Sequence, residues 1–262
     1  MINNLLNKIY KLNIVKITII IGILIYGVWL LSPSPNNLSI KESVLIMNII
    51  KKGDVNKLNY KLKHELNPNS CLCNRSQLSL LQKGSFPSDI IDVPIITFAC
   101  TFGTPKIVQA LLDHGAKVNN TDGDDAPLMR AVEPNNNPEI VKMLLENGAH
   151  VNQRDSNKET ALMAASMDGM TKSADNRRLK IFELLLKYGA DPNIKNFQGE
   201  TALTRSVDTS IHDSNLEEVI LLIRYHANTN INDIDGNNLI REAIFGENPK
   251  IAAYLIKVSK RK

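Results

Sequence analysis

The side chains best suited to chemistry in this 262-residue chain are three cysteines and five histidines. Cys71 and Cys73 stand two positions apart, and with His64 and Cys100 they offer thiolate and imidazole groups, which zinc prefers. Structural zinc sites mostly use cysteines separated by two residues, so this spacing argues against a metal site. The open alternatives are a disulfide between Cys100 and one of the pair, or no disulfide at all. Three cysteines exclude a disulfide-built scaffold.

Motifs that arrange catalytic groups are missing from the sequence. It contains no G-x-S-x-G nucleophile motif, no phosphate-binding G-x-x-x-x-G-K and no dinucleotide-binding glycine fingerprint. His64 and Glu65 begin like a zinc-protease motif, but no second histidine follows four residues after the first. We therefore expect no catalytic residue, no cofactor and no small-molecule substrate, which means that the chain is not an enzyme.

Charge is distributed unevenly along the chain. Residues 1–88 hold 11 Lys and Arg against 3 Asp and Glu, whereas residues 89–262 hold 20 against 24. Because the larger part is acidic, we do not expect a nucleic-acid-binding protein. Hydrophobic residues make up 43% and charged residues 22% of the sequence, which is typical of a folded globular chain.

An uncharged apolar run occupies residues 17–31. Lysines precede this run and no basic residue follows it before Lys41, an asymmetry that keeps the N-terminus in the cytoplasm. The end of the run lacks the small residues of a signal-peptide cleavage site. The sequence thus predicts a basic cytoplasmic tail at 1–13, a transmembrane anchor at 14–31 and a linker at 32–39. The alternative is a cleaved signal that releases the protein into the periplasm.

A repeated pattern dominates the rest of the chain, and its clearest copies are Leu111–Asn119, Leu144–Asn152, Leu185–Asn193 and Leu222–Asn230. In each copy a leucine-rich helix ends in a tight turn, and a second helix follows about ten residues later. Such a two-helix unit cannot bury its apolar face alone, so successive copies must stack. Equivalent alanines recur every 33 to 41 residues, which is typical of a helical repeat array.

This pattern resembles the ankyrin repeat. Thr160-Ala161-Leu162 match the family's Thr-Pro-Leu, and Gly189-Ala190-Asp191 match its Gly-Ala-Asp, although His226 replaces the glycine of the last clear copy. The resemblance implies an all-α solenoid of five or six helix-turn-helix repeats, preceded by one N-terminal transmembrane or signal helix. We expect this domain at 40–262, with a degenerate cap at 40–63, an irregular insertion at 64–91 and repeats over 92–257. A second insertion is expected at 170–178.

The resemblance further implies that hairpin tips and first helices form a concave face that binds protein. The aligned positions are rich in carboxylates and apolar side chains and contain no Lys or Arg: Phe102, Asp122, Asp125, Glu133, Asn157, Glu159, Met167, Asp168, Phe197, Gln198, Glu200, Asp208, Ile234, Asp235 and Phe245. Apolar anchors inside an acidic rim predict a partner protein with a basic surface patch. The alternative is that the aspartates are turn residues and that some of the phenylalanines pack inward.

A membrane-tethered array of this size looks like a bacterial envelope protein. Exported bacterial ankyrin proteins of this kind include immunity proteins, which bind and block an antibacterial toxin such as a phospholipase or another lipase. The sequence therefore predicts a non-enzymatic protein-binding module on the non-cytoplasmic, periplasmic side of a membrane. The alternative function is an envelope scaffold that stabilises a protein of the same cell.

Overall fold

The computed structural model describes residues 37–72, 93–119, 126–132, 137–166, 172–208, 216–230, 238–245 and 248–260. The predicted tail, the predicted anchor and most of the predicted linker lie outside these ranges. Among the described residues, none of the helices combines the length and the apolar character that crossing a bilayer requires.

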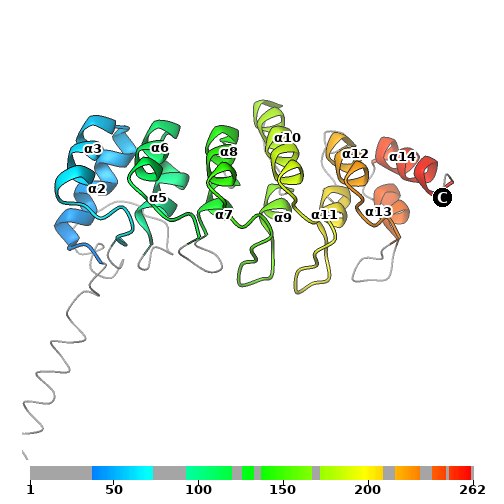
Figure 1. Cartoon of the computed structure of the whole chain (residues 1–262). Coiled ribbons are helices and arrows are strands. Elements are labelled where there is room, and N and C mark those ends of the chain that lie inside the picture. Colours follow the sequence, from blue (N-terminus) through cyan, green and yellow to red (C-terminus); the bar gives the residue numbers. More distant parts are fainter. Residues whose placement is uncertain are drawn as a thin grey trace, which may run out of the picture.

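The described residues form six helix pairs that stand side by side in one elongated row (Figure 1). The first helices of the pairs are α2 (Ile40–Lys52), α5 (Ile95–Phe102), α7 (Pro127–Val132), α9 (Ala161–Ala165), α11 (Ala202–Asp208) and α13 (Leu239–Phe245). The second helices are α3 (Val55–His64), α6 (Pro105–Asp113), α8 (Pro138–Glu146), α10 (Lys172–Lys187), α12 (Leu216–Arg224) and α14 (Pro249–Ser259).

Each pair packs on the next, first helix against first helix and second against second, as α5 does on α7 and α10 on α12. The leucines of the repeated pattern lie in the shared interior and are fully buried: Leu111, Leu144, Leu185 and Leu222. The small side chains of Ala161 and Ala202 are also buried, which lets neighbouring first helices approach closely. One core therefore runs through the described pairs, and the predicted all-α solenoid is confirmed.

Local sequence signals account for where the helices begin and end. The Thr160 hydroxyl accepts a hydrogen bond from the Met163 N–H and caps α9. α10 is followed by Gly189, whose φ of 87° lies in the left-handed region that glycine adopts without strain. His226, which replaces glycine after α12, adopts the same left-handed backbone at φ 65°. The turn is thus kept even where its preferred residue is lost.

An asparagine ladder joins the successive turns that follow α3, α6, α8, α10 and α12 along the row. In one rung the Asn152 side chain donates to the Gly189 carbonyl at 3.0 Å and accepts from the Asp191 N–H at 2.8 Å. The other rungs have the same two bonds, and the asparagines of the ladder are Asn69, Asn119, Asn152 and Asn193. The polar edge of the array is therefore joined by hydrogen bonds between repeats, in addition to the apolar core.

Asn152→Ala is expected to lower the free energy of unfolding by about 1–2 kcal/mol, because it removes both hydrogen bonds of one rung. Urea denaturation measures this loss. Asn147→Ala is the matched control, because the Asn147 side chain bonds only the Met143 carbonyl of its own repeat. Equal losses in the two variants would show that the ladder adds nothing between repeats.

Both predicted insertions differ from the sequence expectation at their edges. Residues 65–72 fall in the predicted insertion, yet Asn69 places them in the regular turn that follows α3, as the first rung of the ladder. Residues 172–178 form the start of α10, which makes this helix longer than the other second helices. The added residues of this repeat therefore extend a helix, and they place Arg178 inside the stack, where it is 2% exposed.

Candidate protein-binding surface

Two hairpin tips, residues 154–160 and 195–201, project past the first helices between α8 and α9 and between α10 and α11 (Figure 1). We call them the paired tips. In the first tip the Asp155 carboxylate accepts hydrogen bonds from the Asn157 and Glu159 N–H groups at 2.9 and 2.6 Å. In the second tip the Asn196 side chain accepts from the Glu200 N–H at 2.9 Å. Turn chemistry therefore shapes both tips, as aspartate and asparagine do in many turns.

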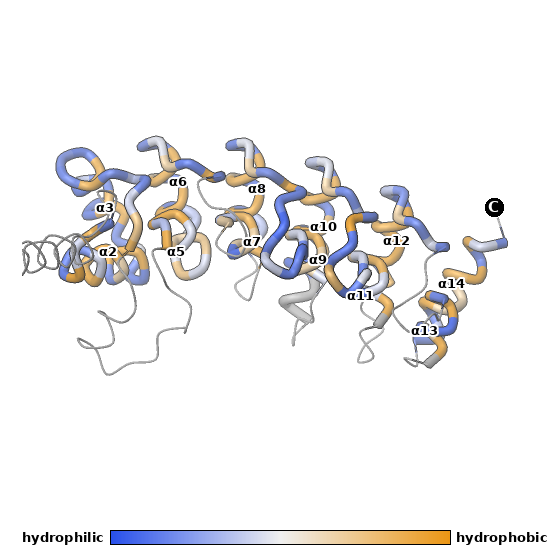
Figure 2. Tube along the Cα trace, turned by 90° about the horizontal axis from the view of Figure 1, so that it is seen from below, coloured by the Kyte–Doolittle hydropathy of each residue, from blue (hydrophilic) through white to orange (hydrophobic). Residues whose placement is uncertain are grey.

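One main-chain hydrogen bond and one hydrogen bond from the Arg154 side chain join the two tips to each other. The Phe197 N–H donates to the Asn157 carbonyl at 3.1 Å. The Arg154 guanidinium donates to the Lys195 carbonyl of the neighbouring tip at 2.8 Å, and its Nε donates to the Lys158 carbonyl at 3.3 Å. The paired tips are therefore hydrogen-bonded to each other, and Figure 2 shows them as largely hydrophilic when the array is viewed from below.

Arg205 of α11 binds a carboxylate from each tip. Its Nη1 donates to Glu159 Oε2 at 3.0 Å and its Nε donates to Glu200 Oε2 at 3.1 Å, and a second guanidinium nitrogen also contacts Glu159. Burial alone lowers the pKa of Arg205, but the hydrogen bonds and charges of Glu159 and Glu200 outweigh burial and raise it above the ordinary value. The guanidinium therefore stays charged and holds both tips against α11.

This ion-pair network corrects the predicted acidic rim. The sequence analysis treats Glu159 and Glu200 as carboxylates available to a basic partner. In the structure both carboxylates face Arg205, and their side chains are only 14% and 29% exposed. Arg205 offsets one of the two negative charges and turns both carboxylates toward α11, so these residues contribute less to an acidic surface than the sequence analysis expects.

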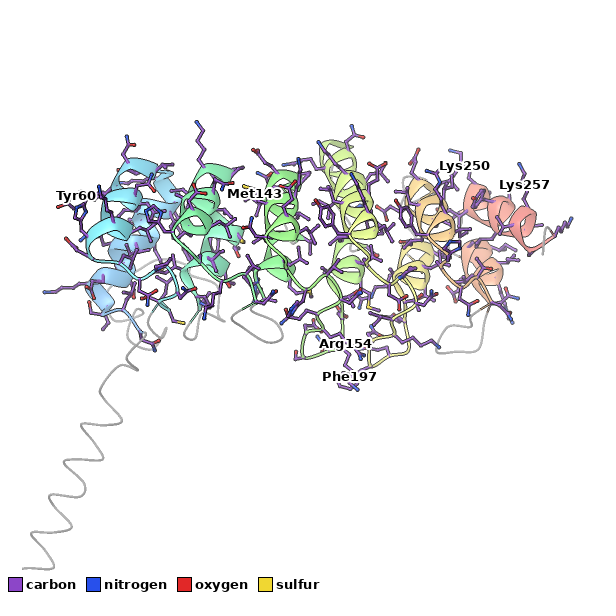
Figure 3. The ribbon with its side chains drawn as sticks, viewed as in Figure 1. Tyr60, Met143, Arg154, Phe197, Lys250 and Lys257 are labelled. Carbon is purple, nitrogen blue, oxygen red and sulfur yellow. The ribbon has the colours of Figure 1, made fainter. Side chains whose placement is uncertain are left out.

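Phe197 is the most exposed large apolar side chain of the described residues, at 63%. Lys158 Nζ lies over its ring, 4.5 Å from the centroid, in a cation–π arrangement. Figure 3 places Phe197 and Arg154 together at the ends of the tips, far from Tyr60 on α3. Asn157 and Gln198 beside them are exposed as well. The paired tips therefore present one exposed aromatic ring, and its residue is hydrogen-bonded through the main chain to the neighbouring tip.

Phe102 differs from Phe197 in its surroundings. It is half-buried at the end of α5 and packs against the core, with its ring centroid 4.7 Å from that of Phe98. Lys51 of α2 lies over the Phe102 ring at 5.3 Å. Phe102 is therefore less exposed than the sequence analysis expects, because α2 and the core cover part of its ring, and its role as a partner contact stays a prediction.

The other predicted contact residues are placed only in part. Asp208 and Phe245 stand at the last positions of α11 and α13. The remaining predicted contacts lie outside the described residues: Asp122, Asp125, Glu133, Met167, Asp168, Ile234 and Asp235. The acidic character predicted from Asp122, Asp125 and Asp235 stays a prediction.

The sequence reasoning missed Arg205, although the sequence carries a signal for it. Glu-Thr-Ala-Leu occurs twice, at 159–162 and at 200–203, directly before two first helices. A glutamate that recurs next to a capping threonine occupies a repeated structural position, and an unpaired charge would not be expected there. The recurrence of this glutamate therefore indicates that it pairs with a residue of the array, and not that it contacts another protein.

Two of the three cysteines, Cys71 and Cys100, lie within the described residues. Cys100 is buried and forms no disulfide, so the disulfide to Cys100 that the sequence left open is not present. Burial raises the pKa of the Cys100 thiol, which keeps it protonated at neutral pH and unable to act as a thiolate. Among these residues, no three His, Cys, Asp or Glu side chains come together in a way that could hold a metal ion.

Comparison with known families identifies a repeat family. A family model described as ankyrin repeats (3 copies) matches residues 47–155 and again residues 128–209. The two matches together cover more than half of the chain and extend from α2 to just beyond α11. No curated protein matches the chain significantly.

Proposed function

The chain belongs to the ankyrin-repeat family, whose arrays are in general non-enzymatic protein-interaction modules, and from this premise we propose that it binds another protein through the paired tips. The observation that carries this proposal is Phe197, a large aromatic side chain that is 63% exposed at the end of a projecting tip. Exposed aromatic residues of this kind are frequent energetic centres of protein interfaces.

The rigidity of the tips supports a binding role. The Phe197 N–H bonds the neighbouring tip, and Arg205 holds both tips against α11. A partner therefore meets a ring that is already positioned, and association does not have to order a mobile loop. A solitary exposed phenylalanine on a flexible segment would lack this advantage.

We further propose that the array acts on the non-cytoplasmic side of a membrane, as an immunity protein that binds and blocks a toxin such as a phospholipase. The uncharged run at 17–31, which lysines precede and no basic residue follows before Lys41, supports this orientation. The lack of catalytic motifs in the sequence suits a protein that inhibits by covering another protein's surface. Fold alone does not determine this role, so a direct test is required.

Phe197→Ala is expected to weaken binding of the partner about 10- to 100-fold, in the range measured for buried aromatic anchors. The partner is first copurified with the full-length protein from its native membrane and identified by mass spectrometry. Calorimetric titration then measures the dissociation constant. Tyr60→Ala is the control, because Tyr60 is 59% exposed but lies on α3, away from the tips.

Thermal unfolding of the Phe197→Ala protein should remain close to that of the wild type, because an exposed ring contributes little to the core. A large drop in melting temperature would mean that the ring is structural. Glu200→Lys is unsuitable as a binding test, since it breaks the ion pair with Arg205 and disturbs both tips.

Inhibition of the partner separates the two candidate roles. If the copurified partner is a lipase or another toxin, adding an excess of the protein should abolish its activity in a turnover assay. A partner that keeps full activity and melts at a higher temperature in the complex would contradict the immunity role and favour an envelope scaffold.

A further inference from the structure

On the paired tips, the basic side chains are exposed and the acidic side chains are not. The exposed charged side chains of the tips are all basic, namely Arg154, Lys158 and Lys195. The carboxylates of the same segments are all half-buried, namely Asp155, Glu159 and Glu200. The surface of the tips is therefore cationic, although the two segments contain equal numbers of acidic and basic residues.

Hydrogen bonds explain why the carboxylates do not reach the surface. The Asp155 carboxylate accepts hydrogen bonds from two N–H groups of its own turn, and the Arg205 guanidinium donates hydrogen bonds to both Glu159 and Glu200. Within the ranges that the structure describes, no carboxylate pairs with Arg154, Lys158 or Lys195. Among the described carboxylates, none therefore offsets these three exposed positive charges.

One of these cations contacts the exposed aromatic ring, and the other two belong to the same paired tips. Lys158 Nζ sits 4.5 Å from the centre of the Phe197 ring, and Lys195 precedes that ring by two residues in the same tip. The guanidinium of Arg154 spans the two tips by donating to the Lys195 carbonyl. The surface thus combines one apolar anchor with three basic groups.

We propose that the paired tips bind an acidic segment of the partner protein, in which an apolar depression receives Phe197 and neighbouring Asp or Glu side chains pair with Lys158, Lys195 and Arg154. This inference rests on the proposed function. It reverses, at the described tips, the charge that the sequence predicts for the partner. Complementary charge of this kind accelerates association and selects among partners, and salt weakens it.

Photo-crosslinking tests the chemistry of the contacted segment. The photoreactive residue p-benzoylphenylalanine replaces Phe197 in the full-length protein, and the same residue replaces Tyr60 in a control protein. After irradiation of the producing cells, mass spectrometry identifies the crosslinked peptide. We expect the Phe197 position, and not the Tyr60 position, to capture a partner segment in which Asp and Glu outnumber Lys and Arg.

A captured segment in which Lys and Arg are in excess would overturn the inference and leave the proposed function standing. If the partner copurifies but no crosslink forms at position 197, the paired tips are not the contact surface, and the inference fails together with the proposed binding site. If no protein copurifies or crosslinks, the proposed function fails together with the inference.

Charge reversal tests the same contact in the purified complex. Lys158→Glu combined with Lys195→Glu is expected to weaken binding at least about 10-fold near 0.15 M salt, and the difference should shrink as salt rises. The matched control is Lys180→Glu with Lys187→Glu, which changes the net charge equally at two exposed positions of α10. We expect less than a twofold effect from the control. Unchanged or tighter binding by the tip variant would overturn the inference.

Discussion

Glu218→Ala is expected to lower the free energy of unfolding by about 3–5 kcal/mol, the largest effect among the substitutions proposed for this protein. Glu218 of α12 and Arg178 of α10 form an ion pair with 2.6 Å between Oε1 and Nε, and their side chains are 3% and 2% exposed. Ser206 of α11 donates a further, long hydrogen bond of 3.5 Å to Glu218. Removing the glutamate leaves the buried Arg178 guanidinium without the Glu218 carboxylate, and losing one partner of a buried ion pair is strongly unfavourable.

Urea denaturation of the purified protein measures this effect. Glu217→Ala is the matched control, because it removes a neighbouring glutamate of the same helix that is exposed to solvent. We expect the control to change the free energy of unfolding by less than about 0.5 kcal/mol.

A paired replacement separates the charge from the packing. Arg178→Met combined with Glu218→Leu removes both buried charges and keeps similar volume, so it should recover most of the stability. If Glu218→Ala instead lowers stability by less than about 1 kcal/mol, water reaches the pair and the buried-charge explanation is wrong.

Leu185→Ala is expected to lower the free energy of unfolding by about 2–5 kcal/mol through lost burial and a residual cavity. Leu185 is fully buried in α10, a helix that contacts α8, α9 and α12. A cavity there loosens the contacts to both neighbouring repeats, and rigid backbones close such a cavity only in part.

The same denaturation experiment tests Leu185→Ala against Glu183→Ala, an exposed position of the same helix that should change stability by less than about 0.5 kcal/mol. A loss below about 1 kcal/mol for Leu185→Ala would mean that the helix repacks and that the core is less closely packed than the burial of Leu185 indicates. Comparison with Phe197→Ala is informative, since one substitution should reduce stability and the other should reduce binding.

The repeated elements could be predicted because each copy uses the same local physics. Leu185 and Gly189 occupy positions at which any such unit needs a buried side chain and a left-handed turn, and the structure places both as expected. His226 looked like a weakness in the pattern, yet it adopts the left-handed backbone that glycine would have taken. Here the stacking of neighbours outweighs the preference of a single residue.

The charged sites could not be predicted in the same way, since they depend on contacts between repeats. Glu159 looks solvent-exposed in its own copy, but its partner Arg205 lies 46 residues further along the chain. Arg178 falls in a segment that the pattern assigns to an insertion, and its partner Glu218 belongs to the next repeat. No spacing rule within one copy connects these residues, so only the stacked geometry shows which charges are neutralised.

The asparagine ladder has a mechanical consequence when the array is pulled from its two ends. Each rung connects one turn only to the next, as Asn152 connects its turn to Gly189 and Asp191. A pulling force along the row would therefore load the rungs in series, and the weakest would rupture first. The array would then extend in steps, with one helix pair separating from its neighbour in each step.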